Sequence, residues 1–232
     1  MTSGAPDWTS VTGGLTPERL LTYSQVSAPV AMSDDFESTI LKFVQETGTV
    51  TRETTGTILG GLSSPIVNGS EALKLAAAIN SIATTSRIFT LNQVAFSMGL
   101  SCYYTYDNLG SFKNTADSIR FEIFWDDGTN SWGEYIGFNL STNVWSYSPE
   151  DANNFTSFTT LKTDENQNHY IKIVIDFVNA KLVYVILDGL KFNINVSVNK
   201  VASVGGQITG VVRVTIRAPL GNAQNLWLDD VK

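Results

Sequence analysis

The sequence has very few of the residues that usually bind zinc or act as nucleophiles, since its 232 residues include a single cysteine and a single histidine. One cysteine cannot form an intrachain disulfide, and Cys102 with His169 cannot supply the ligand set of a structural zinc site. The tyrosines that follow Cys102 predict a thiol buried in a strand. His169 lies in a polar segment with no visible base or nucleophile partner, so we expect a histidine in a surface loop.

Charged residues are also scarce, and acidic residues outnumber basic ones. The chain has 15 lysines and arginines against 22 aspartates and glutamates, which gives a net charge of −7. Proteins that bind the phosphate backbone of nucleic acids need clustered lysine and arginine, and the sequence contains no such stripe. We therefore expect no nucleic-acid partner.

Long apolar runs are absent as well. No segment reaches the length of a membrane-spanning helix, and residues 1–10 lack the basic start and apolar centre of a Sec-type signal peptide. This pattern fits a protein that stays inside the cell, one that leaves by another route, the mature part of a longer protein, or one that is carried out in a particle. Of these we favour an extracellular, cell-surface or virion location without a membrane span.

The clearest pattern that is present is an alternation of apolar and polar residues between positions 170 and 189. Ile171, Ile173 and Ile175 point one way and their neighbours the other, and after a short break the alternation resumes. The second run ends in Asp188-Gly189, a pair that is typical of tight turns. The stretch therefore predicts a β hairpin.

From residue 34 onward the sequence consists of short strand-like runs separated by turn residues. Further strands are expected at 40–44, 49–53, 72–77, 88–98, 102–106, 118–125, 134–139, 144–147, 192–198, 211–217 and 226–231. Many short strands with regular turns predict an all-β fold, a two-sheet antiparallel sandwich that spans residues 34–232.

Residues 1–33 differ from the rest because they mix glycine and proline with a single short helix, which is expected to start at Thr16 and Pro17. We interpret this segment as an extended N-terminal arm. It is expected to dock either on its own sandwich or on a neighbouring subunit.

Three segments of the strand pattern resemble the concanavalin A-like lectin/glucanase jelly roll, in its laminin-G-like branch. They are Asp34-Asp35-Phe36-Glu37, the early strand from Glu71 to Leu75, and the hairpin that ends in Asp-Gly. Residues 227–231 resemble the last strand of such domains, which returns to pair near the first. The resemblance covers residues 34–232. Galactose-binding-like carbohydrate modules, with an early Phe-Glu and a terminal Asp-Asp-Val, remain an alternative fold.

The resemblance brings no recognisable catalytic set with it. Glucanases of this group flank the glycosidic bond with paired carboxylates, and the nearest candidate here, Glu122 with Asp126 or Asp127, lacks their alternating spacing. Glu122 is instead expected to pair with Arg120 or with a cross-strand neighbour. Lyases of this fold use histidine, tyrosine and arginine or glutamine, and His169 stands alone. We therefore expect the chain not to be an enzyme.

Related sandwiches often hold a structural calcium near their termini, so the resemblance implies a candidate Ca²⁺ site where the first and last strands meet. Carboxylate oxygens are the ligands that Ca²⁺ prefers. The candidate ligands are Asp34, Asp35, Glu37, Asp229 and Asp230. The alternative is that these carboxylates are solvated or cap turns, and no other cofactor is expected.

Aromatic residues are dense between positions 124 and 147, and a glycan platform needs exposed aromatic rings. The candidate ligand-binding residues are Trp132, Tyr135, Trp145 and Tyr147, with packing in the core as the alternative. Two functions follow for the chain. The first is a non-enzymatic lectin-like module for glycan binding or surface attachment. The second is a structural subunit of a particle, such as a capsid decoration, tail or surface-layer protein, that forms a homo-oligomer or larger assembly with neighbouring subunits through its arm.

Overall fold

The computed structural model describes residues 34, 36–37, 42–54, 70–90, 97–107, 118–149, 155–203, 208–218 and 222–232. The expected N-terminal arm with its helix, and Asp35, lie outside these residues, so docking and assembly through the arm stay predictions. The described residues form strands and no helix. They contain no helix that is long and apolar enough to span a membrane.

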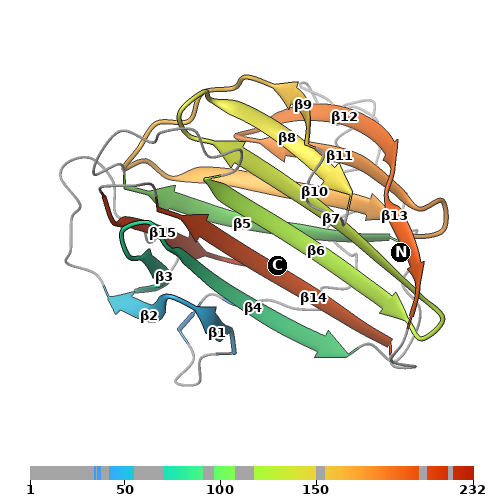
Figure 1. Cartoon of the computed structure of the whole chain (residues 1–232), viewed down its shortest axis with the longest axis horizontal. Helices are drawn as coiled ribbons and strands as arrows, with labels where there is room; N and C mark the ends of the chain where they lie inside the picture. Colours follow the sequence, from blue (N-terminus) through green and yellow to red (C-terminus); the bar gives the residue numbers. More distant parts are fainter. Residues whose placement is uncertain are drawn as a thin grey trace, which may run out of the picture. The chain divides into compact units, whose positions relative to one another are not determined.

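The strands form two antiparallel sheets that pack as the two layers of a sandwich (Figure 1). The eight-stranded sheet contains, in order, β1 (Val44–Thr47), β4 (Ile82–Thr90), β14 (Ile208–Arg217), β6 (Ile119–Asp127), β7 (Asn130–Asn139), β8 (Val144–Pro149) and β9 (Thr156–Thr159), with β13 (Asn199–Ala202) beside β7. The seven-stranded sheet contains β12 (Leu190–Ser197), β11 (Lys181–Leu187), β10 (His169–Asp176), β5 (Ser97–Tyr106), β15 (Gln224–Asp229), β3 (Glu71–Ala77) and β2 (Thr49–Thr54). The all-β, two-sheet jelly-roll prediction is therefore confirmed.

The predicted hairpin is formed by β10 and β11, which pair with Ile171 opposite Leu187. Ile171, Ile173 and Ile175 are fully buried, as the alternation predicts, while the residues between them are partly exposed. Asp188 and Gly189 then join β11 to β12, with positive φ angles of 47° and 84°. Two positive φ values in succession are typical of a type I′ turn, which explains the Asp-Gly pair.

The ends of the sandwich meet as the resemblance implies. Asp34 and Val231 form an isolated antiparallel bridge with two backbone hydrogen bonds, of 2.8 and 2.9 Å. Two expected strands were misplaced: the one at 88–98 overlaps only the end of β4 and the start of β5, and the one at 40–44 overlaps β1 only at Val44. Two further strands, β9 and β13, were not expected from the sequence at all. Both are only four residues long, and β9 has no buried residue, so neither carries the alternation that reveals a longer strand.

One edge of β7 is shared by two strands. Its first half pairs with β13, with Gly133 opposite Asn199, and its second half pairs with β8, with Glu134 opposite Pro149. At this junction Glu134 faces the core, since it lies opposite the buried Ile123 of β6. The side chain is fully buried, and its Oε2 atom has no hydrogen-bond partner among the described residues. Burial raises the pKa of Glu134 to about 8, although backbone hydrogen bonds from Tyr135 and Ser148 lower it.

Candidate functional site

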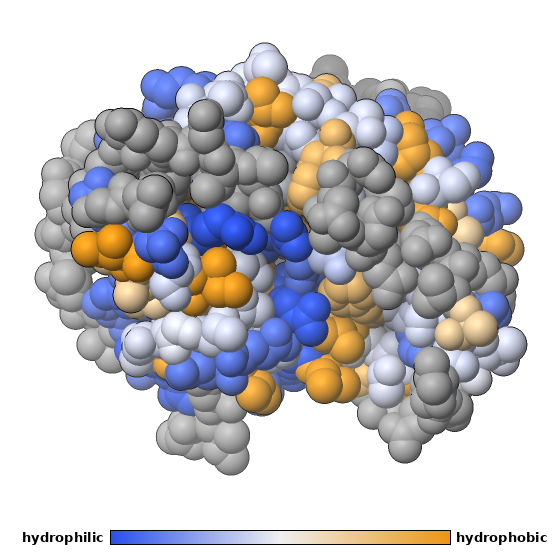
Figure 2. Space-filling model, viewed as in Figure 1, coloured by the Kyte–Doolittle hydropathy of each residue, from blue (hydrophilic) through white to orange (hydrophobic). Residues whose placement is uncertain are grey.

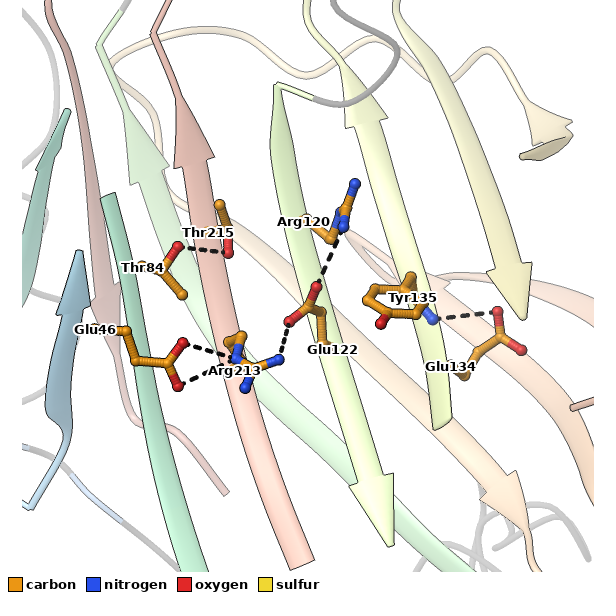
Figure 3. A network of polar contacts seen from close by, with 8 residues as sticks. All are labelled: Glu46, Thr84, Arg120, Glu122, Glu134, Tyr135, Arg213 and Thr215. Carbon is orange, nitrogen blue, oxygen red and sulfur yellow. Dashed lines mark hydrogen bonds and ion pairs between the residues drawn. The ribbon is translucent and has the colours of Figure 1, made fainter. Parts of the chain in front are cut away.

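The candidate site lies on the outer face of the eight-stranded sheet, the face turned away from the other layer. In β6 the core-facing residues Phe121, Ile123 and Trp125 are buried, so Arg120, Glu122 and Phe124 point outwards. Glu122 lies opposite Arg213 of β14 on one side and opposite Tyr135 of β7 on the other. The register therefore places an arginine, a glutamate and a tyrosine in one row across three strands (Figure 3).

These outward side chains form what we call the outer-face cluster. Its members are Glu46, Arg120, Glu122, Phe124, Tyr135 and Arg213. Figure 2 shows strongly hydrophilic residues at the centre of this face, over β14 and β6, with hydrophobic residues beside them.

A chain of ion pairs runs through the cluster (Figure 3). The Nε atom of Arg213 lies 3.0 and 3.2 Å from the two carboxylate oxygens of Glu46, and its Nη1 atom lies 3.4 Å from Glu122 Oε2. On the other side, Arg120 Nη1 lies 3.5 Å from Glu122 Oε1. Glu122 was expected to pair with Arg120 or with a cross-strand neighbour, and it pairs with both.

Glu122 is the buried centre of this chain, with only 3% of its surface exposed. Burial raises the pKa of its carboxyl above the usual value, and the charges of Arg213 and Arg120 act in the opposite direction. Glu122 thus holds the two guanidinium groups from beneath.

Aromatic rings lie against both arginines. The guanidinium carbon of Arg120 is 5.1 Å from the centre of the Tyr135 ring and 5.5 Å from that of Phe155. The guanidinium carbon of Arg213 is 5.4 Å from the centre of the Phe124 ring, which meets Tyr135 edge to face at 5.5 Å. Contacts of this kind fix the planes of the guanidinium groups and leave their N–H edges to make hydrogen bonds.

Hydroxyl groups and glycines complete the face. Thr84 of β4 and Thr215 of β14 lie opposite each other, with their hydroxyl oxygens 3.1 Å apart. Gly133 and Gly137 are the neighbours of Tyr135 on this side of β7, because side chains alternate along a strand. Tyr135 therefore stands without a bulky neighbour on its own strand, and the face combines charged, hydroxyl and aromatic groups.

The structure does not bring the four predicted aromatic residues together. Trp145 is fully buried, stacks on Phe138 at 4.5 Å and donates a hydrogen bond from Nε1 to the Leu161 carbonyl oxygen. Trp132 faces the core, where it packs on Phe177.

Tyr147 lies opposite Ile136 and packs against the core. Tyr135 belongs to the outer face instead, since it lies three positions from Trp132 and side chains alternate along a strand. Of the four predicted residues, Tyr135 is the one in the outer-face cluster.

The predicted calcium ligands that the structure describes each have a partner within the protein. Asp34 lies 3.0 Å from Arg87 and accepts a hydrogen bond from the Phe36 amide. Glu37 accepts hydrogen bonds from the hydroxyl and amide of Ser70 and from the Glu71 amide, and the Ser70 hydroxyl is the main cause of its lowered pKa.

Asp229 is buried and accepts a hydrogen bond from the Asp230 amide, while Asp230 pairs with Lys232 at 2.7 Å. Across the described ranges, no group of three or more histidine, cysteine, aspartate and glutamate side chains is placed to hold a metal ion. Calcium stays a prediction.

The expectation of a surface histidine was wrong, because His169 is 7% exposed at the start of β10. It packs against Tyr104, with ring centres 5.4 Å apart, and its two nitrogens face Asp188 and the Asp164 carbonyl oxygen. Cys102 is buried as predicted, and burial raises the pKa of its thiol.

Sequence reasoning missed Arg213 and Glu46 altogether. They are 167 residues apart in the chain, so only the pairing of β1, β4 and β14 reveals their contact.

No family model matches the sequence, and no curated protein matches it. Among solved structures, the metal-free lectin I-B4 from Griffonia simplicifolia matches with a TM-score of 0.53 at 13% identity, over 86% of this chain and 97% of the lectin. A carbohydrate esterase from the Shiga toxin-encoding bacteriophage phi24B matches with a TM-score of 0.46 at 14% identity, over 82% and 88% of the two chains. Alginate lyase vAL-1 from a Chlorella virus matches with a TM-score of 0.47 at 12% identity, over 79% and 90%.

These matches correct one expectation. The prediction that the chain is not an enzyme was wrong, because it excluded an activity that the comparisons leave open. The similar solved structures include a carbohydrate esterase and an alginate lyase beside the lectins. Enzymatic activity is therefore open. Together with the two antiparallel sheets, the match to lectin I-B4 shows that the chain has the concanavalin A-like lectin fold.

Proposed function

We propose that the chain is a carbohydrate-binding module that holds its ligand on the outer face of the eight-stranded sheet. The observation that carries this proposal is the ion-pair chain of Arg213, Glu122 and Arg120, which lies beside the rings of Phe124 and Tyr135. A sugar has apolar ring faces and many hydroxyl groups. Such a ligand is bound by aromatic surface next to charged hydrogen-bonding groups. The outer-face cluster offers the half-buried ring of Phe124 beside Arg213, whereas the ring of Tyr135 is only 9% exposed and packs against Arg120.

The lectin-like fold supports this proposal at the level of the scaffold. A location outside the cell, at its surface or in a virion would suit a glycan binder and also stays a prediction.

The test measures binding of the full chain to a panel of soluble polysaccharides by affinity electrophoresis, followed by calorimetry on those that retard it. Arg213→Gln and Phe124→Ala should each weaken binding about tenfold or more, since each removes a direct contact. The matched control is Lys172→Gln, in β10 on the outer face of the other sheet, which should bind as the wild type does.

The two faces of the sandwich compete as binding surfaces in this experiment. The seven-stranded sheet carries its own tyrosines, among them Tyr103 and Tyr170 with ring centres 5.2 Å apart. If Tyr170→Ala abolished binding while Arg213→Gln preserved it, the ligand would lie on that sheet and the proposal would be wrong.

A further inference from the structure

We propose that the saccharide bound by the outer-face cluster carries carboxylate groups, which are recognised by Arg213 and Arg120. This inference rests on the proposed function and names the class of ligand. Three observations support it. The two guanidinium groups are more exposed to solvent than Glu122, aromatic rings hold the guanidinium of Arg120 in position, and the Glu46 carboxylate on Arg213 can be replaced by a carboxylate of the ligand.

The cations of the cluster are more exposed than the carboxylate between them. The side chain of Arg213 is 33% exposed and that of Arg120 is 17% exposed, whereas the side chain of Glu122 is 4% exposed. Glu122 therefore lies beneath the two arginines in the ion-pair chain (Figure 3). A ligand that settles on this face meets guanidinium groups before it meets Glu122.

The guanidinium of Arg120 is held in position by rings. Tyr135 and Phe155 both lie within 5.5 Å of it, measured from the guanidinium carbon to the ring centres. Rings against a guanidinium restrict its contacts to the N–H edges, which lie in its plane. A planar group with two acceptor oxygens fits such an edge, and a carboxylate is the planar acceptor that sugars carry.

Arg213 already holds a carboxylate that can be exchanged. Its Nε atom pairs with Glu46, and both side chains of that pair are 33% exposed. Solvent-exposed ion pairs contribute little to stability, so replacing Glu46 by a ligand carboxylate costs the protein little. In the described part of the chain, the hydrogen bonds of Arg213 come from Nε and Nη1, which leaves Nη2 to a ligand.

Long-range attraction does not contribute to this recognition. The chain has a net charge of −7, so an acidic polymer is repelled at a distance and is bound only where its carboxylates reach the two arginines. The selectivity therefore has to come from direct contact on this one face.

The experiment compares two forms of one polymer, polygalacturonate and the same polymer after reduction of its carboxylates to alcohols. Affinity is measured by calorimetry at neutral pH and physiological salt. The wild type should bind the acidic form about tenfold or more tightly than the reduced form, which corresponds to one charge-assisted hydrogen bond. Arg213→Gln should lose most of this difference, because it weakens binding of the acidic form more than binding of the reduced form.

Glu46→Gln gives the sharper result, because it should strengthen binding of the acidic form several-fold by removing the competing carboxylate from Arg213. A gain of affinity cannot come from misfolding, so this variant decides the matter even if Arg213→Gln is unstable. The matched control is Arg52→Gln, whose arginine pairs with Glu71 in the other sheet and should change neither affinity.

Equal affinity of the wild type for both forms would overturn the carboxylate inference and leave the proposed function standing. Weaker binding of the acidic form by Glu46→Gln would also overturn it. If the chain bound neither form of the polymer and none of the polysaccharides of the panel, the inference and the proposed function would both be overturned.

Discussion

His169 and Asp188 form an ion pair at one end of the seven-stranded sheet, with Nδ1 of the imidazole 2.7 Å from Oδ2 of the carboxylate. The other nitrogen, Nε2, lies 2.7 Å from the carbonyl oxygen of Asp164. Both partners are acceptors, and a neutral imidazole has a single N–H to donate. Only the protonated ring can donate to both, so the pair joins the segment before β10 to the turn between β11 and β12 through an imidazolium.

The charge on His169 makes stability depend on pH. Burial lowers the pKa of His169, but the hydrogen bonds to Asp188 and to the Asp164 carbonyl outweigh it, so the pKa is raised. A raised pKa in the folded state gives stability that is present below the unfolded value of about 6.5 and is lost as the pH rises through the folded value. The difference in unfolding free energy between wild type and His169→Gln should therefore shrink above about pH 6.5.

Urea denaturation across a pH series measures this difference. Glu165→Gln, in the exposed part of the same loop, serves as the control and should follow the wild type. A wild-type advantage over His169→Gln that stayed constant with pH would show that the ring is neutral in the folded protein.

Glu134 gives a second pH dependence. Its pKa is raised to about 8 by burial, so the folded chain keeps a proton that the unfolded chain loses near pH 4.5. Stability should fall as the pH rises between these values, by about 5 kcal/mol in total. Glu134→Gln should remove this slope, and Glu134→Leu should remove it too while adding apolar surface to the core. Parallel stability curves for wild type and both variants would contradict the assignment.

Substitution of Gly189 should lower the stability of the chain because of its backbone conformation and not because of a steric clash. Its φ angle is +84°, and a Cβ atom added there would meet nothing within 4 Å. Gly189→Ala should therefore destabilise the chain by about 1 kcal/mol through backbone strain. Gly189→Asn should lose less, because asparagine tolerates positive φ better. Thermal unfolding of both variants tests this, and equal losses would point to a lost contact instead.

Trp145 should act through packing. The side chain is fully buried against Phe138, and its Nε1 atom satisfies the Leu161 carbonyl. Trp145→Ala should lower the free energy of unfolding by about 3 to 5 kcal/mol. Trp145→Phe should lose less, since it keeps most of the apolar volume. A variant with wild-type stability and lost glycan binding would instead support the ligand-platform role that the sequence suggests.

The predicted structural calcium implies a metal-dependent melting temperature. Chelation should lower the Tm, added Ca²⁺ should restore it, and Asp230→Asn should respond to neither. An unchanged Tm after chelation would remove the calcium prediction.

The fold was largely predictable from the sequence because alternation is a local signal. The buried isoleucines of β10 and the Asp-Gly turn after β11 lie within twenty positions of one another, so they reveal the hairpin without any knowledge of the partner sheet. The short strands β9 and β13 escaped detection because their pairing is set by β8 and β7, not by their own sequence.

The candidate site was less predictable because it depends on register. Glu122 and Arg213 are 91 residues apart, and only the pairing of β6 with β14 places them side by side. Alternation alone could have separated Tyr135 from Trp132, since residues three apart on a strand point to opposite faces. What no local pattern shows is which of the two faces lies outside.

The shared edge of β7 has a consequence for the order of folding. The chain leaves that edge at Pro149 and returns to the adjacent position at Asn199, after building β9 and the three strands β10, β11 and β12. The β10–β11 and β11–β12 ladders form between strands that are neighbours in sequence. The β7–β13 ladder instead closes a long loop, from Pro149 to Asn199, and its formation costs the conformational entropy of closing that loop. We expect the β7–β13 ladder to be the late step in folding and the first part of this edge to open.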